Sequence, residues 1–172
     1  MDGQEIELKL GLEPEDMALL RRHPPLAGEA GGRDHAAPCR LASIYYDTPD
    51  FALAAAGLTV RLRRVGERHL QTVKTGGNRA AGLFVRGEWE TELAGPALDP
   101  AHLRATGLPL FADSGLLDRL RPVFATDIRR TLIRLTGPAG DDGPAWEVEA
   151  ALDLGEVVAG PQSESICEVE LE

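Results

Sequence analysis

The most frequent pattern in the sequence is an alternation of polar and apolar residues, which is typical of a β-strand with two different faces. In residues 5–10, Glu-Ile-Glu-Leu-Lys-Leu, the side chains of Glu5, Glu7 and Lys9 share one face, and the apolar side chains share the other. The same alternation predicts strands at 5–10, 43–46, 58–65, 69–74, 84–93, 128–136, 146–153 and 166–172. Strands therefore predominate in the predicted structure.

The predicted helices are few and short, and each has a start or stop signal. Residues 14–23 begin with a proline and carry acidic residues early and arginines late, as the helix dipole favours. Residues 48–50, Thr-Pro-Asp, predict the start of a second helix, which Gly57 ends. Two further helices are expected, from residue 99 toward residue 107 and around 115–121. Gly/Pro-rich loops are expected at 28–38 and 137–145. The fold class is therefore α+β, built on an antiparallel sheet.

The charged residues on the polar strand faces are segregated by strand. Acidic residues occupy the first and last strands, whereas Arg61, Arg63 and Lys74 lie on the central hairpin. A solvated sheet face usually mixes the two signs, although an open sheet in water would explain any one of these strands. A closed barrel with the charges inside explains all of them, and its interior would need water, metal ions or a highly charged ligand. The pattern alone leaves both interpretations open.

Composition narrows the possible partners. The length of 172 residues suits one domain, and the net charge of −10 argues against nucleic acid or an anionic membrane as the main partner. No stretch is apolar enough to cross a membrane, and the acidic N-terminus is unlike a signal peptide, so we expect a cytoplasmic protein. Cys39 and Cys167 lie far apart in the sequence, which predicts reduced thiols and no zinc site.

Six ordered blocks resemble the CYTH family, also called the triphosphate tunnel metalloenzymes. The first is Glu-Ile-Glu-Leu-Lys at 5–9, which matches the ExExK signature of that family. The others are 45–50 with 58–63, Lys74 with 86–88, 126–130, 151–157 and 166–172. The resemblance covers nearly the whole chain and is strongest to the bacterial inorganic triphosphatases. It implies a closed antiparallel β-barrel of about eight strands, with short helices packed outside, formed by residues 1–172.

The resemblance also implies the site residues. Four carboxylates would hold Mg²⁺ or Mn²⁺, which prefer oxygen ligands: Glu5, Glu7, Glu168 and Glu170. Six cations would bind the phosphate chain: Lys9, Arg61, Arg63, Lys74, Arg86 and Arg130. The catalytic set would be Lys9, Arg61, Arg63 and Glu170. Arg86 is expected to pair with Glu88, and Glu149 and Glu172 are expected to support the metal ligands, whereas Asp153 has no assigned role. Tyr45 and Tyr46 are expected to pack in the barrel wall.

The implied activity is metal-dependent hydrolysis of inorganic triphosphate to diphosphate and phosphate inside the tunnel. Hydrolysis of thiamine triphosphate or nucleoside triphosphates, and cyclisation of ATP as in class IV adenylyl cyclases, are alternatives. A module that binds polyphosphate without cleaving it is another, as is a purely structural barrel. In the family, a helix and a terminal Ser-Lys segment follow the last strand, and a helical CHAD domain often lies downstream, so further segments are expected after residue 172.

Overall fold

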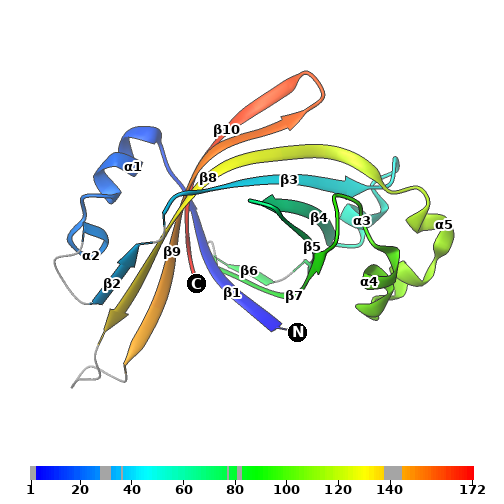
Figure 1. Cartoon of the computed structure of the whole chain (residues 1–172), viewed down its shortest axis with the longest axis horizontal. Helices are drawn as coiled ribbons and strands as arrows, with labels where there is room; N and C mark the ends of the chain where they lie inside the picture. Colours follow the sequence, from blue (N-terminus) through cyan, green and yellow to red (C-terminus); the bar gives the residue numbers. More distant parts are fainter. Residues whose placement is uncertain (1–2, 28–31, 36, 77, 81–82, 138–144) are drawn as a thin grey trace.

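The computed structural model describes residues 3–27, 32–35, 37–76, 78–80, 83–137 and 145–172. Figure 1 shows one curved sheet with short helices at its two ends. The strands are β1 (Gly3–Gly11), β2 (Gly32–His35), β3 (Cys39–Asp47), β4 (Leu58–Val65), β5 (Arg68–Thr75), β6 (Asn78–Ala80), β7 (Leu83–Leu93), β8 (Arg121–Gly137), β9 (Trp146–Ala159) and β10 (Gln162–Leu171). The helices are α1 (Pro14–Leu20), α2 (Pro24–Ala27), α3 (Ala52–Ala55), α4 (Pro100–Ala105), the 3₁₀ helix η1 (Pro109–Ala112) and α5 (Ser114–Leu117).

The strands pair in the order β1-β10-β9-β8-β3-β4-β5-β7, and every pair is antiparallel. A further antiparallel pairing joins β7 to β1 and so closes these eight strands into one circuit. The short strands β6 and β2 attach to β7 and β8. The predicted α+β barrel of about eight strands is therefore confirmed.

Alternation along each strand assigns one face to the interior and one to the outside. On β4, Arg61 and Arg63 point into the central cavity, while Val60 and Leu62 are buried on the other face. On β9, Asp153 faces the cavity and Leu152 packs outside. The polar faces that the sequence left ambiguous thus line the inside of the barrel.

Two apolar clusters hold helices against the outer face. One joins the helices at α3–α5 to β4 and β5, with the buried side chains Leu53, Val60, Val73, Leu103, Phe111, Leu116 and Leu117. The other joins α1 and α2 to β8, β9 and β10, with Met17, Leu26, Ile133, Ala150, Leu152 and Val169. Burial of these side chains removes apolar surface from water without using the inner face. No helix in the described ranges has the length and apolar character needed to cross a bilayer.

The link between β3 and β4 is fixed by one buried carboxylate. Asp47 accepts hydrogen bonds from the backbone N–H groups of Thr48 (2.7 Å), Leu53 (2.9 Å) and Ala54 (3.0 Å). The Thr48 hydroxyl accepts from the N–H of Ala52 at 2.9 Å, so α3 begins at Ala52, later than predicted. Gly57 ends this segment with φ +68°, as predicted. These bonds fix the start of β4 and therefore the positions of Arg61 and Arg63.

Several strands and helices begin or end at other residues than predicted, because pairing with adjacent strands, and not local alternation, determines where they begin and end. β8 begins at Arg121 instead of residue 128, since residues 121–127 pair with β3 and β9 although their alternation is weak. Within the expected loop 28–38, residues 32–35 form β2 by pairing with the long β8, while 28–31 and 36 lie outside the described residues. In the other expected loop, Gly137 ends β8 and residues 138–144 lie outside that description. The predicted helix at 115–121 is the shorter α5.

Candidate active site

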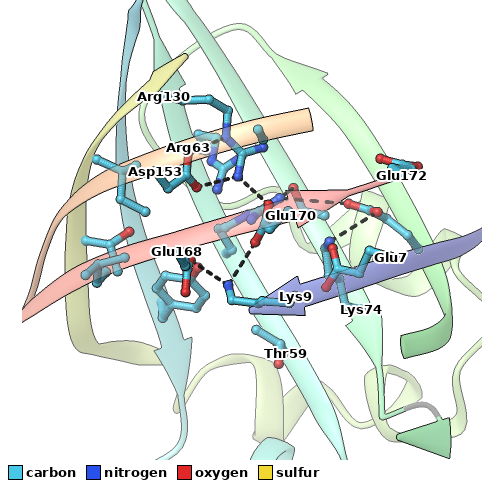
Figure 2. Close-up of a pocket in the computed structure, with 18 of the residues that line it drawn as sticks. Glu7, Lys9, Thr59, Arg63, Lys74, Arg130, Asp153, Glu168, Glu170 and Glu172 are labelled. Carbon is cyan, nitrogen blue, oxygen red and sulfur yellow. Dashed lines mark hydrogen bonds and ion pairs between the residues drawn. The ribbon is translucent and has the colours of Figure 1, made fainter. Parts of the chain in front are cut away.

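The barrel encloses a cavity of about 800 Å³ whose wall carries side chains from β1, β3–β5 and β7–β10. Figure 2 shows how these side chains converge from opposite strands. The described lining includes five cations: Lys9, Arg61, Arg63, Lys74 and Arg130. It also includes eight carboxylates: Glu7, Glu88, Glu90, Glu149, Asp153, Glu168, Glu170 and Glu172. The cavity is therefore highly charged, with an excess of negative charge among these residues.

Lys9 lies between two carboxylates of the neighbouring strand. The register pairs Lys9 with Glu170 and Gly11 with Glu168. The Lys9 ammonium consequently lies 2.6 Å from Glu168 and 2.8 Å from Glu170. Burial alone would lower the pKa of Lys9, but the two carboxylates outweigh it and raise that pKa. Lys9 thus stays charged inside the barrel.

Arg130 makes the most extensive ion-pair network in the cavity. Its guanidinium binds both oxygens of Asp153, at 2.8 Å and 2.6 Å, and also lies 2.5 Å from Glu170. The Asp153 side chain is only 1% exposed. Burial would raise the pKa of Glu170, but Arg130 and Lys9 dominate and lower it to about 2, so Glu170 is ionised at neutral pH. Asp153 is a site residue that sequence reasoning missed, although its alternation with Glu149 and Ala151 placed it on the inner face.

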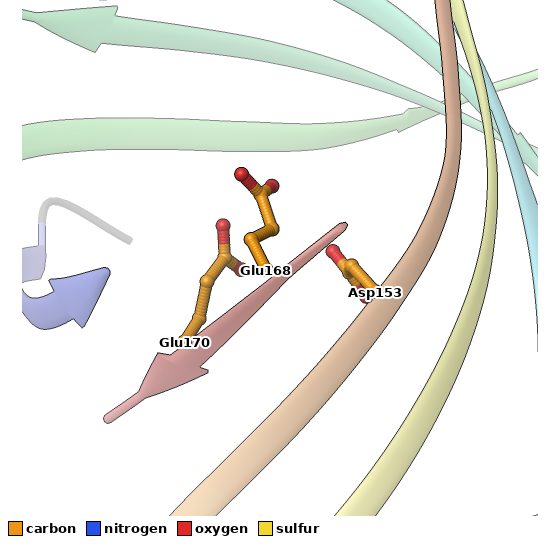
Figure 3. Close-up of side chains that lie close together, drawn as sticks. All are labelled: Asp153, Glu168 and Glu170. Atoms are coloured by element: carbon orange, nitrogen blue, oxygen red, sulfur yellow. The ribbon is translucent and has the colours of Figure 1, made fainter. Parts of the chain in front are cut away.

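Three carboxylates lie close enough together to share one metal ion. Asp153, Glu168 and Glu170 have oxygen atoms within 4.8 Å of one another, and Figure 3 shows them projecting from β9 and β10 toward a common point. Lys9 and Arg130 occupy part of their acceptor capacity, but each carboxylate has about four lone-pair sites. A hard divalent cation with oxygen ligands fits this donor set.

Of the other two predicted metal ligands, Glu5 and Glu7, the structure describes the side chain of Glu7 alone. Glu7 is 5% exposed and lines the cavity, but the β1–β10 register places Glu168 and Glu170 opposite Gly11 and Lys9. The backbones of Glu5 and Arg86 pair across β1 and β7, and their side chains lie outside the described part of the chain. Glu172, expected to support the metal ligands, pairs with Glu149 through two backbone hydrogen bonds of 2.8 Å and 3.0 Å.

On the β4–β5–β7 wall, carboxylates accompany the cations, so the segregation of charge is less strict than the sequence indicated. Glu88 lies 3.3 Å from Lys74 and 3.8 Å from Arg61. Thr72 donates to Glu90 at 3.2 Å and accepts from Arg61 at 3.3 Å. Because β7 lies between β5 and β1, its acidic face meets the basic face of β5 directly. Glu88 thus has partners other than the expected Arg86.

Arg63 differs from the other four cations. Its Nε donates to the Ser43 hydroxyl at 3.0 Å, and within the described ranges it forms no ion pair. Burial, followed by repulsion from Arg61, lowers the pKa of Arg63 to about 10. Next to it, Tyr45 lines the cavity and stacks on Phe124 with ring centroids 4.3 Å apart. Arg63 is therefore a half-buried cation that an anionic ligand would stabilise.

This geometry defines an antiparallel barrel whose charged interior can hold a polyanion together with divalent metal. A family profile for the CYTH domain matches residues 3–172. The chain belongs to the CYTH domain family.

Known relatives and solved structures agree with this assignment. An inorganic triphosphatase from Haemophilus influenzae is 30% identical over 169 residues, which are 98% of this chain and 45% of that protein. The chain thus spans less than half the length of this curated relative. A Hippeastrum protein described as an adenylyl cyclase with dominant triphosphatase activity superposes with a TM-score of 0.67 at 16% identity, covering 99% of this chain and 79% of the other. A Bacillus halodurans protein described as an adenylate cyclase gives 0.57 at 17% identity, covering 99% and 81%. Both structures show the shared fold.

Proposed function

We propose that this chain hydrolyses inorganic triphosphate to diphosphate and phosphate inside the cavity, with Mg²⁺ or Mn²⁺ as cofactor. The observation that carries the proposal is the convergence of five cations on one cavity, with Arg63 half-buried and without an ion pair among the described residues. A phosphate chain offers many acceptor oxygens to arginine and lysine donors. The 30% identical inorganic triphosphatase supports the same substrate. Free Cys39 and Cys167 are compatible with the proposed cytoplasmic location.

The charge balance supports metal dependence. Eight carboxylates and five cations line the described cavity, so a polyanion entering alone would meet an excess of negative charge. Asp153, Glu168 and Glu170 would hold the metal, with Glu7 on the same cavity wall. Glu5 remains a predicted ligand. When bound, the metal would neutralise phosphate oxygens and favour attack by water.

The cations would supply most of the catalysis by positioning the substrate and neutralising charge. In phosphoryl transfer, the protein mainly aligns the reacting groups and stabilises charge on the phosphate oxygens. Lys9, Arg61 and Arg63 would act in this way on the reacting phosphates, and Lys74 and Arg130 would hold the chain; Arg86 stays a predicted binding residue. Glu170 would keep Lys9 and Arg130 oriented, since it contacts both and remains ionised.

The lining favours a substrate without an organic group. Among the described lining residues Tyr45 is the one aromatic, and it already stacks on Phe124. Recognition of a base would require stacking or hydrogen-bonding groups beside the phosphates. We therefore expect kcat/KM for inorganic triphosphate to exceed that for ATP by about tenfold or more, a difference of about 1.4 kcal/mol.

A phosphate-release assay across inorganic triphosphate, ATP, thiamine triphosphate and long polyphosphate, each with Mg²⁺ or Mn²⁺, tests the proposal. Inorganic triphosphate should give the highest kcat/KM. Faster turnover of ATP or thiamine triphosphate would refute the substrate assignment. Tight binding of polyphosphate without phosphate release from any substrate would instead identify a non-catalytic binding module.

A further inference from the structure

Thr126 places an unsatisfied hydroxyl on the inner face of β8. Its side chain shares a face with Ile128 and Arg130, which line the cavity, whereas Asp127 points outward to the exposed Arg40. Thr126 is 8% exposed, and its Oγ1 has no hydrogen-bond partner in the described structure. A buried hydroxyl without a partner is costly and is uncommon in native proteins. A ligand that accepts a hydrogen bond would remove this cost.

The side chains directly opposite Thr126 do not satisfy its hydroxyl. In the sheet register Thr126 lies opposite Ser43, and Ser43 lies opposite Arg63. Side chains directly opposite in an antiparallel pair have Cβ atoms about 4.5–5.5 Å apart. The Ser43 oxygen already accepts from Arg63 Nε, and on the other flank Thr126 faces the apolar Val157. Arg63 and Thr126, which line the cavity on either side of the buried Ser43, therefore have donor groups that a ligand in the cavity could satisfy.

A second unpaired donor lies on the same strand as Arg63. The Nε of Arg61 is buried and has no acceptor among the described residues, although its Nη2 bonds to Thr72. Lys9 and Arg130, by contrast, are each held by two carboxylates. Thr126 Oγ1 and Arg61 Nε thus lack the acceptors that Lys9 and Arg130 already have.

We propose that Thr126 is a substrate-binding residue whose hydroxyl donates to an oxygen of the phosphate group held by Arg63, in a subsite that does not require metal. The inference rests on the proposed function, because the ligand is the phosphate chain of that substrate. Arg63 would supply the charge, while the Thr126 hydroxyl would fix the rotation of one phosphate group. Hydrogen bonds to a charged acceptor are stronger than those between neutral groups.

The test is binding of inorganic triphosphate, by calorimetry, to the whole chain and to Thr126→Val, Thr126→Ser and Thr131→Val. Thr131 is on the outer face of the same strand and serves as the matched control. Thr126→Val should weaken binding in excess chelator about tenfold, while Thr126→Ser and Thr131→Val bind as wild type does. The ratio of the Kd of Thr126→Val to that of wild type should also be about ten with Mg²⁺ present. The ligand-free melting temperature of Thr126→Val should equal or exceed that of wild type, since the unpaired hydroxyl is gone.

The outcomes separate this inference from the proposed function. Wild-type binding by Thr126→Val, with triphosphate still hydrolysed, overturns the role of Thr126 and leaves the proposed function intact. Weak binding accompanied by a lowered ligand-free melting temperature and no recovery in Thr126→Ser would show a structural role and would also overturn it. If wild type binds triphosphate through Thr126 but releases no phosphate, the proposed hydrolysis fails and the subsite stands. A wild-type protein that binds triphosphate only with Mg²⁺ overturns the metal-independent subsite, and one that binds it neither in chelator nor with Mg²⁺ overturns both.

Discussion

Arg130 on β8 and Arg63 on β4, which are separated in the barrel wall by β3 alone, show two environments for a half-buried arginine in one barrel. Arg130 contacts Asp153 and Glu170, whereas Arg63 contacts the hydroxyl of Ser43 and has no carboxylate partner within the described chain. Accordingly, the pKa of Arg130 is raised above its ordinary value and that of Arg63 is lowered. A paired cation fixes the position of the carboxylates around it, while an unpaired one is best stabilised by an incoming anion. The surroundings of Arg130 and of Arg63 therefore suit different parts of a metal–triphosphate complex.

Removal of metal should produce the largest effect, since the carboxylate-rich wall otherwise repels the substrate. Chelation is expected to abolish phosphate release, and Glu168→Gln should lower kcat/KM by about a hundredfold or more, which corresponds to about 2.7 kcal/mol. Glu156→Gln, on the exposed outer face of β9, is the control and should have wild-type activity. Full turnover of inorganic triphosphate in excess chelator would contradict the assignment of Asp153, Glu168 and Glu170 as metal ligands.

Replacement by methionine should change the free energy of unfolding differently for the paired Arg130 and the unpaired Arg63. Arg130→Met leaves Asp153 buried without its partner, and loss of one member of a buried ion pair typically costs about 3–5 kcal/mol. Arg63→Met removes a half-buried cation that repels Arg61, so the free energy of unfolding should stay the same or rise. Denaturant unfolding of the ligand-free proteins measures both. Equal destabilisation of the two variants would show that Arg63 has a structural partner comparable to Asp153.

The low pKa of Glu170 makes the carboxylate wall sensitive to acid. In the folded protein this pKa is about 2, below the ordinary value of 4.5 for a glutamate, so the stabilising contribution of Glu170 is complete above about pH 4.5 and is lost as the pH falls toward 2. The groups facing it are Lys9, Arg130, Arg63 and Glu168. Glu170→Gln should flatten the decline in unfolding free energy over this range, and Glu156→Gln should retain it. If the unfolding free energy of Glu170→Gln declines with acid as that of wild type does, the ion pairs of Glu170 with Lys9 and Arg130 do not stabilise the fold.

Alternation predicted most of the strands and which side chains share a face, because it is a local property, whereas the inward direction of the charged faces was implied only by the family resemblance. Arg61 and Arg63 could be placed on one face of a strand from their spacing, and the structure puts both in the cavity. Spacing could not predict which residues face one another across strands, since that depends on register. The β1–β10 register places Lys9 opposite Glu170, and β9 brings Asp153 to Arg130, which no local pattern indicated. Likewise, β2 forms because β8 offers an edge, although its own residues resemble a loop.

The smallest effect should come from Glu88, which accompanies the cations on the other wall. Its carboxylate lies 3.3 Å from Lys74 and 3.8 Å from Arg61, so it competes with a phosphate for both. Glu88→Gln keeps the shape of the side chain and removes its charge. The Kd for inorganic triphosphate without metal should therefore fall about threefold to tenfold. This is a gain in binding free energy of at most about 1.4 kcal/mol. This sign is opposite to the one expected for Thr126→Val, and the same calorimetric titration in chelator measures both. If Glu88→Gln binds triphosphate more weakly than wild type, then Glu88 orients Lys74 and Arg61 for the phosphates and does not compete with the phosphates for them.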